Sequence, residues 1–465
     1  MATEILMPRL SPAMEEGTLA KWLVAEGQSV SAGDVIAEIA SGRATMEIEA
    51  HAEGRLARIL VPAGTARVRV DTPIAVLVAK ESGIAPSPHV GEGRGGVDGR
   101  PSAAGSDTGM PPVTSAGTPP TLGPFPRGGG EKTTTITMRE ALRDAIAEEM
   151  RRDPDVLLIG VDVTQGEGAH KVAEGLADEF GTGRVIDTPI TEQGFVGIAV
   201  GAAFAGLKPV VELMNWSFAM QAIDHIINSA AKTLYMSGGA LSCPIVLRGP
   251  NGATSQVGAQ HAQCYAAWYA HVPGLKVVAP SNSADAKGLL KSAIRDANPV
   301  LVLESEALYE TLCEVPVDDE WLVPIGKARI ARQGRDVTIV AFGRAMVHAL
   351  AAAERLAGDG IEAEVIDLRS LRPLDMETVL TSVARTNRIV IVEEAWPVCS
   401  VGSEIAARVA IEAFDHLDAP PAKVSGADVP MPYAANLERL ALPGPEQVIE
   451  ATLRVLYRNE DGRPR

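Results

Sequence analysis

The sequence predicts a multidomain chain in which a small β-rich unit is followed by a flexible connection and two α/β domains with parallel sheets. Three observations predict this organisation. The first 80 residues repeat one β-type pattern twice, residues 81–130 consist mainly of Gly, Pro, Ser and Ala, and the remainder alternates apolar strand-like runs with amphipathic helical stretches. A length of 465 residues also suggests about three domains.

The front unit, residues 1–80, contains an internal repeat. The segment GTLAKWLV at 17–24 is echoed by GRLARILV at 54–61, and each copy is followed by a glycine and a second strand-like run. Short β-branched runs between Gly, Asp and Pro turns, duplicated once, predict two similar half-sheets. We expect these half-sheets to form a flattened β-barrel.

We expect residues 81–133 to form a linker. Phe125 is the only aromatic residue in 81–130, so this stretch cannot form a hydrophobic core. In the rear unit, strands are expected at 156–160, 185–187, 210–213, 245–247, 277–278 and 300–303, and helices at 139–152, 195–207, 220–235 and 284–295. A second set has strands at 337–341, 364–366 and 389–393. This alternation predicts parallel sheets covered on both faces, in one domain at 134–322 and another at 323–465.

Composition and charge exclude several classes of protein. The chain is 46% hydrophobic and 22% charged, and its net charge of -17 without any Lys/Arg block argues against nucleic acid or an anionic membrane as a partner. The N-terminus resembles neither a secretory signal nor a transit peptide, and no apolar run approaches the roughly 20 residues that span a bilayer. The four cysteines are too scattered for a zinc site. We therefore expect a reduced, cytoplasmic protein.

Three long segments carry a resemblance to a known family. They are DTPITEQGFVGIAVGAAFAGLKPVVELMNWSFAMQAIDHIINSAAKTLYMSGG (187–239), the stretch from RGPNGATSQVGAQHAQCYAAW onward (248–304), and SGADVPMPYA (425–434). These segments resemble the β subunits of thiamine-diphosphate-dependent 2-oxo acid dehydrogenases, of the pyruvate dehydrogenase kind. The resemblance implies the pyrimidine-binding and C-terminal domains of transketolase-like enzymes.

Glu192 is the first residue that this resemblance reinterprets. Because it follows Pro189 and Thr191, the residues alone suggest an acid in the first turn of a helix. The resemblance implies instead that Glu192 bonds the aminopyrimidine ring of thiamine diphosphate and favours the tautomer that acts as an internal base. It likewise implies that Met214 and Phe218, otherwise ordinary core residues, pack on that ring.

His261 and a cation site are further implications of the resemblance. On its own, His261 would pass as a buried structural histidine. In the matching Ala-Gln-His sequence it is implied to lie near the acyl group and the incoming lipoyl arm, for proton transfer or charge stabilisation. The resemblance also implies a potassium site with oxygen ligands, formed by Ile245, Ala293, Asp296 and Asn298.

The motif that holds the diphosphate through Mg²⁺ is missing. Gly358-Asp359-Gly360, followed later by Asn387, imitates that motif, but it lies between a helical stretch and a strand, where a helix-ending glycine is expected. We interpret it as a turn. The resemblance places the true motif, and with it Mg²⁺, on a separate α subunit.

The front unit resembles lipoyl domains but lacks their acceptor. Where the family shows a pattern like ETDKATME, residues 40–47 read ASGRATME, so Arg43 replaces the lysine. A guanidinium stays protonated and cannot form the lipoyl amide. Neither Lys21 nor Lys80 occupies the expected hairpin tip, and we expect no lipoyl modification.

A second departure falls near the implied active site. Relatives usually carry two adjacent acids where this chain has Gly160-Val161-Asp162-Val163, so the first acid is Val161. Gly166 and His170 stand where relatives often carry tyrosines.

The resemblance implies a β subunit that buries thiamine diphosphate against α subunits in an α2β2 assembly, decarboxylates pyruvate and passes the acyl group to lipoyl arms of an acyltransferase. Three alternatives stay open. The chain could serve an acetoin or branched-chain 2-oxo acid dehydrogenase, or be a catalytically weakened structural or regulatory paralogue, as Arg43 and Val161 suggest. A free-standing transketolase-like enzyme is the third, against which the missing diphosphate motif counts.

Overall fold

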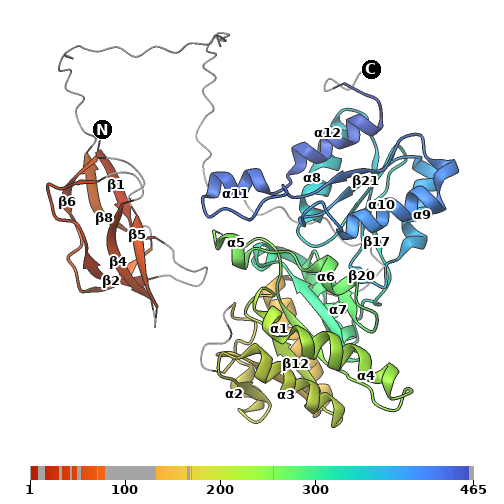
Figure 1. Cartoon of the computed structure of the whole chain (residues 1–465), viewed down its shortest axis with the longest axis horizontal. Coiled ribbons are helices and arrows are strands. Elements are labelled where there is room, and N and C mark those ends of the chain that lie inside the picture. The colour runs from red at the N-terminus through yellow and green to blue at the C-terminus, as the bar shows by residue number, and fades with distance from the viewer. Residues whose placement is uncertain are drawn as a thin grey trace, which may run out of the picture. The chain divides into compact units, whose positions relative to one another are not determined.

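The computed structural model describes residues 2–8, 16–30, 34–41, 44–49, 54–70, 72–78, 132–164, 168, 170–254 and 256–459. The chain divides into two compact units, Met1–Ser115 and Ala116–Arg465 (Figure 1). Residues 81–131 of the predicted linker lie outside the described ranges, whereas Thr133 already begins a strand. Within the described ranges, no helix is long and apolar enough to cross a membrane.

The front unit is a pair of four-stranded antiparallel sheets, as the repeat predicts. The strand orders are β1-β8-β6-β3 and β5-β4-β2-β7. Leu19 of β2 and Leu56 of β6, equivalent in the two copies of the repeat, are both fully buried between the sheets. The strands are β1 Ala2–Leu6, β2 Glu16–Trp22, β3 Ser29–Val30, β4 Val35–Ser41, β5 Ala44–Glu49, β6 Gly54–Ile59, β7 Thr65–Arg69 and β8 Pro73–Val78.

The first α/β domain is built on a seven-stranded sheet of order β11-β10-β12-β13-β15-β14-β20. Its first six strands are parallel, and every residue of β10, β13 and β15 is buried, as expected for a sheet covered on both faces. The strands are β10 Val156–Gly160, β11 Val185–Asp187, β12 Lys208–Glu212, β13 Val246–Pro250, β14 Lys276–Val278 and β15 Val300–Glu304. The helices are α1 Met138–Arg152, α2 Leu176–Phe180, α3 Glu192–Phe204, α5 Gly258–His261, α6 Ala266–Ala270 and α7 Ser283–Ile294.

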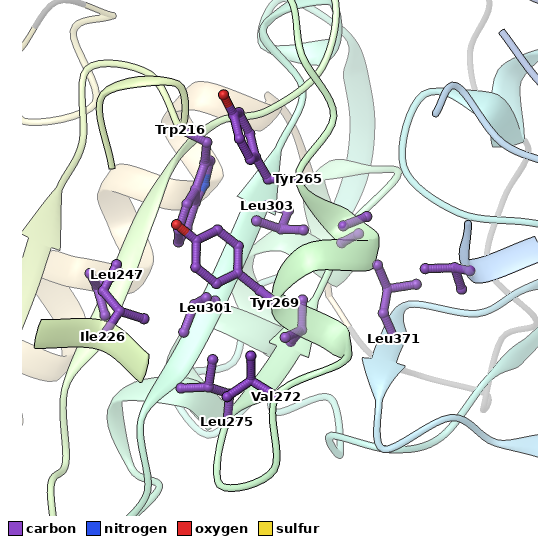
Figure 2. Packing of buried hydrophobic residues seen from close by; sticks show 14 of the residues in the cluster. Trp216, Ile226, Leu247, Tyr265, Tyr269, Val272, Leu275, Leu301, Leu303 and Leu371 are labelled. Atoms are coloured by element: carbon purple, nitrogen blue, oxygen red, sulfur yellow. The ribbon is translucent and has the colours of Figure 1, made fainter. Parts of the chain in front are cut away.

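Aromatic packing fills one face of this sheet. The Trp216 and Tyr269 rings lie 5.0 Å apart, both fully buried, and Tyr265 packs beside them (Figure 2). The indole N–H of Trp216 donates to the Val302 carbonyl at 3.3 Å, which satisfies its polar group inside the core. This packing fixes the segment that follows β12.

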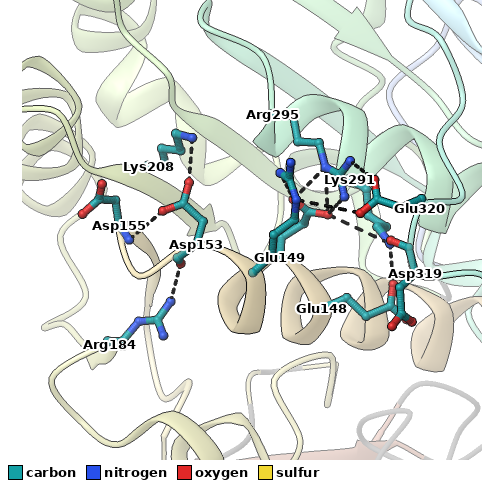
Figure 3. A network of polar contacts seen from close by, with 11 residues as sticks. Glu148, Glu149, Asp153, Asp155, Arg184, Lys208, Lys291, Arg295, Asp319 and Glu320 are labelled. Atoms are coloured by element: carbon teal, nitrogen blue, oxygen red, sulfur yellow. Dashed lines mark hydrogen bonds and ion pairs between the residues drawn. The ribbon is translucent and has the colours of Figure 1, made fainter.

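Ion pairs hold α1 to α7 on the opposite face (Figure 3). Glu149, only 1% exposed, accepts from Arg295 at 2.6 Å, and the fully buried Lys291 donates to Glu148 at 2.5 Å. Buried charges are tolerated when they are paired in this way. Ion pairs as well as apolar contacts therefore connect the two helices.

The C-terminal α/β domain has a five-stranded sheet of order β17-β19-β18-β21-β22, parallel except at β17. Its strands are β17 Arg329–Arg332, β18 Val337–Ala341, β19 Ala363–Asp367, β21 Ile389–Val392 and β22 Ala422–Val424. Its helices are α8 Ala345–Gly358, α9 Met376–Thr386, α10 Val401–Glu412, α11 Ala435–Ala441 and α12 Pro445–Val455. The sheets confirm the predicted fold class.

One strand from the C-terminal part of the chain extends the sheet of the first α/β domain. β20, Ser370–Arg372, leaves the C-terminal domain and pairs antiparallel with β14 of the first sheet. A separate ladder joins β9, Thr133–Thr137, to β16, Leu312–Pro316. We propose that the boundary predicted at 322–323 falls in the connection between β16 and β17.

Two local predictions have clear outcomes. The helix predicted over 220–235 is wrong as one element: it consists of η1 Phe218–Ala222 (3₁₀), η2 His225–Ala230 (π) and α4 Ala231–Met236. A π turn widens the helix, and here it sets His225 so close to Gly197 of α3 that a Cβ there would lie 3.1 Å from the ring. The turn at 358–360 is confirmed, since α8 ends at Gly358 and Gly360 has φ +76°.

Candidate functional site

Glu192 begins α3 and is 4% exposed, although it carries a carboxyl group. Its Oε2 atom is buried without a hydrogen-bond partner among the described residues. A helix N-terminus favours a negative charge, but burying an unpartnered oxygen is costly. A buried carboxyl oxygen without a partner is suited to accept a hydrogen bond from a bound cofactor.

The segment after β12 carries Met214 and Phe218, the two apolar residues that are candidates for packing on the cofactor ring. Met214 is 37% exposed and Phe218 is half-buried, while Trp216 between them anchors the segment by donating its backbone N–H to the Pro250 carbonyl at 2.9 Å. This segment lies at the carboxyl end of a parallel strand, where α/β folds place their ligands. α3 packs directly against η1, so Glu192 and Phe218 come from neighbouring elements.

His261 ends the short helix α5 beside the same segment. Its ring lies 5.0 Å from the Phe218 ring, and its Nδ1 is buried without a partner among the described residues. Asn215 donates from Nδ2 to the His261 carbonyl at 3.1 Å. The fold thus brings His261 to the segment that carries Met214 and Phe218, more than 40 residues earlier in the chain.

The potassium candidates lie at the opposite end of the sheet. Ile245 precedes β13, and its carbonyl accepts from the Val300 amide at 3.0 Å, while the Ala293 carbonyl at the end of α7 accepts from the Asp296 amide at 3.2 Å. The Asp296 carboxylate pairs with Lys276 and accepts from the Asn298 amide at 2.9 Å. Burial alone would raise its pKa, yet these bonds hold the pKa of Asp296 below its usual value.

That carboxylate is therefore already neutralised by an ammonium group. A potassium ion here would rely mainly on carbonyl oxygens. No cluster of three or more His, Cys, Asp or Glu side chains able to hold a metal ion occurs in the part of the chain that the structure describes.

Val161 and His170 are the departures from the family pattern that lie within the described residues. Val161 packs against the apolar core, and Gly166 lies outside the described residues. His170 contacts the Met214 carbonyl through Nε2 at 3.1 Å and packs on the Tyr309 ring at 5.5 Å. Burial lowers the pKa of His170, so its neutral form, donating to Met214, is favoured. Arg43 and Gly42 also lie outside the described residues.

Comparisons with known proteins show the family to which the chain belongs. Residues 134–311 match the family described as transketolase, pyrimidine binding domain, 326–448 match transketolase, C-terminal domain, and 3–77 match biotin-requiring enzyme. The chain is 54% identical to the pyruvate dehydrogenase E1 component subunit beta of Rhizobium meliloti, over 98% of this chain and 100% of that protein. The chain belongs to the pyruvate dehydrogenase E1 β-subunit family.

Other E1 β subunits match the rear unit of this family member. The mitochondrial subunit beta-1 of Arabidopsis thaliana is 58% identical over 70% of this chain and 90% of that protein. Among solved structures, a split-gene transketolase, described as an inactive beta4 tetramer, aligns with a TM-score of 0.55 at 26% identity, covering 69% of this chain and 98% of that one. The pyrimidine-binding domain and the E1 relatives fit a thiamine-diphosphate-dependent component.

Sequence reasoning missed a buried charge network beneath the site of this E1 β-family chain. Arg248 of β13 is fully buried, donates to Glu212 at 2.6 Å and forms a two-pronged pair with Glu304. Tyr309 donates to Glu304 at 2.6 Å, and burial raises the pKa of Glu212. A Cβ on Gly168, in the loop that carries His170, would lie 2.3 Å from Glu212 Oε1. The network thus supports the loop above it.

Proposed function

We propose that the chain is the β subunit of a thiamine-diphosphate-dependent pyruvate dehydrogenase, active only together with an α subunit. The main support for this proposal is the buried oxygen of Glu192 that has no partner among the described residues, because a ring nitrogen of the cofactor could be its hydrogen-bond partner. When bound, thiamine diphosphate supplies the carbon nucleophile that attacks the 2-oxo group and takes up the electron pair as CO₂ leaves.

The chain's own residues have distinct tasks in this proposal. Glu192 shares a proton with the pyrimidine ring nitrogen, which favours the basic tautomer of that ring. Met214 and Phe218 offer apolar contact to the ring and exclude water. His261, whose Nδ1 has no hydrogen-bond partner among the described residues, moves a proton or stabilises charge during acyl transfer to a lipoyl arm.

The partners follow from what the chain lacks. With the turn at 358–360 ending a helix, the described residues offer no diphosphate motif, so an α subunit would hold Mg²⁺ and the diphosphate in an α2β2 assembly. The acceptor would be a lipoyl-bearing acyltransferase in the cytoplasm. A structural K⁺ held mainly by the carbonyls of Ile245 and Ala293 stays part of the proposal.

A second candidate is a catalytically weakened paralogue with a structural or regulatory role. Val161 favours it, because an apolar side chain packs where relatives usually carry an acid. An acetoin or branched-chain 2-oxo acid dehydrogenase β subunit is a third.

Reconstitution separates these candidates. The chain is co-expressed with the α subunit of the same organism. CO₂ release is measured with pyruvate and with a branched-chain 2-oxo acid, and acetaldehyde release is measured with acetoin in a parallel assay. We expect the highest kcat/KM with pyruvate. An assembled complex that turns over none of them would favour the paralogue, and restoration of turnover by Val161→Glu would locate the defect.

A further inference from the structure

The segment that leads from β13 into α5 is held by side chains of the C-terminal domain. Glu394, two residues after the end of β21, accepts a hydrogen bond from the Ala253 backbone N–H. The neighbouring Gly252 has φ +86°, and a Cβ there would lie 2.6 Å from Glu394 Oε1. The Glu394 carboxyl group therefore fills the space that a side chain at 252 would need.

Two more residues of the same domain contact this segment. Glu438 of α11 accepts from the Gln256 backbone N–H at 3.2 Å. The Tyr433 ring lies over Gly258, where a Cβ would come within 2.3 Å of a ring carbon. Three side chains from one domain thus contact one short stretch of the other, between Gly252 and Gly258.

These contacts matter because α5 has few anchors of its own. It is one turn long, has no side-chain cap, and ends at His261. From the first domain, Asn215 holds the His261 carbonyl, and Gly252 donates to the Gln263 carbonyl at 3.0 Å. Backbone N–H groups need partners when they are partly buried, and Ala253 takes its partner from across the domain boundary.

Glu394 also lines a small hollow of ≈ 20 Å³, together with Asn251, Ser305 and Arg344. Loss of the Glu394 acceptor would leave the Ala253 backbone N–H without the partner that it has in the folded chain. The segment could then shift and carry α5 with it.

We propose that Glu394, supported by Glu438 and Tyr433, is a positioning residue that sets His261 for acyl transfer, an inference that rests on the proposed function of His261. The C-terminal domain then contributes to the chemistry of the site.

The test compares Glu394→Ala with Glu394→Gln in the assembled α/β complex, because Gln keeps an oxygen acceptor for Ala253. Glu404→Ala, at an exposed glutamate on α10, is the matched control. Hydrogen exchange of residues 252–261 and the acetylation rate of a lipoyl domain are measured on each. Losing a hydrogen bond to a carboxylate should slow acetylation about tenfold and speed exchange at Ala253, while Gln and the control stay near wild type.

The outcomes separate this inference from the proposed function. Unchanged exchange in Glu394→Ala would overturn the contact, and faster exchange with wild-type acetylation would overturn the positioning role. If Glu394→Gln behaves like Glu394→Ala, the hydrogen bond is not what matters, and the inference is wrong. A wild-type complex without acyl transfer would refute the proposed function, while the exchange data would still report on the contact with Ala253.

Discussion

Replacing Arg248 by Met should strongly destabilise the rear unit. The guanidinium is fully buried between Glu212, 3% exposed, and Glu304, 1% exposed, so its loss leaves two carboxyl groups in the core without a cation. Breaking a buried ion pair on one side costs about 3–5 kcal/mol. Tyr309 can still donate to Glu304, which moderates the loss without removing it.

The pH dependence has a definite sign. In Arg248→Met, burial without the cation raises the folded-state pKa of Glu212 further above its ordinary 4.5. The folded variant then binds more protons than the unfolded chain. Its loss in free energy of unfolding is therefore complete at neutral pH and becomes smaller as pH falls through the raised pKa toward 4.5.

Calorimetry of the full-length chain at pH 7 and pH 5 measures both effects. The melting temperature of the rear unit should be much lower than in the wild type at pH 7, and this difference should be smaller at pH 5. Arg408→Met, which breaks an exposed pair with Glu412 on α10, is the control and should change the transition far less. A loss below about 1 kcal/mol at pH 7, or one that grows at pH 5, would refute this reasoning.

Three further predictions concern cofactor, modification and pH. The chain without an α subunit should bind thiamine diphosphate only weakly, and tight Mg²⁺-dependent binding in calorimetry would contradict this. Co-expressed with a lipoyl ligase, it should show no adduct by intact mass, whereas Arg43→Lys should gain one; an adduct on Lys21 or Lys80 would count against us. Because burial lowers the pKa of His170, the folded state binds fewer protons, and stability should be lost as pH falls below 6.5 through the folded value. His170→Phe should flatten that part of a melting-temperature profile, and an unchanged slope would show that another group is responsible.

Local pattern predicted most elements of the fold. Val156–Gly160, Val185–Asp187 and Val337–Ala341 were predicted with the bounds that the structure has, because buried parallel strands are short apolar runs between polar turns. β20 was missed, since a three-residue strand that pairs with the sheet of the preceding domain carries no periodic signal. The π turn at His225–Ala230 was also missed, and there the His225 ring lies close to Gly197 of α3, a long-range contact that local periodicity does not encode.

From the sequence, the site could be predicted only at residues whose own side chain has a chemical role, such as Glu192. Glu192 could be named from the sequence, but its burial and unpartnered oxygen could not, because they depend on η1 packing against α3. Glu394 and Arg248 gave no signal. Glu394 meets Ala253 across 141 positions of chain, and Arg248 meets Glu212 and Glu304 across 36 and 56. Only the fold brings such partners together.

Glu192→Gln in the assembled α/β complex tests the central claim most directly. Gln keeps the size of Glu and can still hydrogen-bond, so assembly and melting temperature should barely change, but it cannot share a proton with the pyrimidine nitrogen. Pyruvate decarboxylation should fall by about 10²–10⁴-fold. If Glu192 were only a first-turn helix acid, the variant would lose about 0.3–1 kcal/mol of stability and keep its turnover. Near wild-type decarboxylation with a slightly lower melting temperature would contradict our assignment of the site.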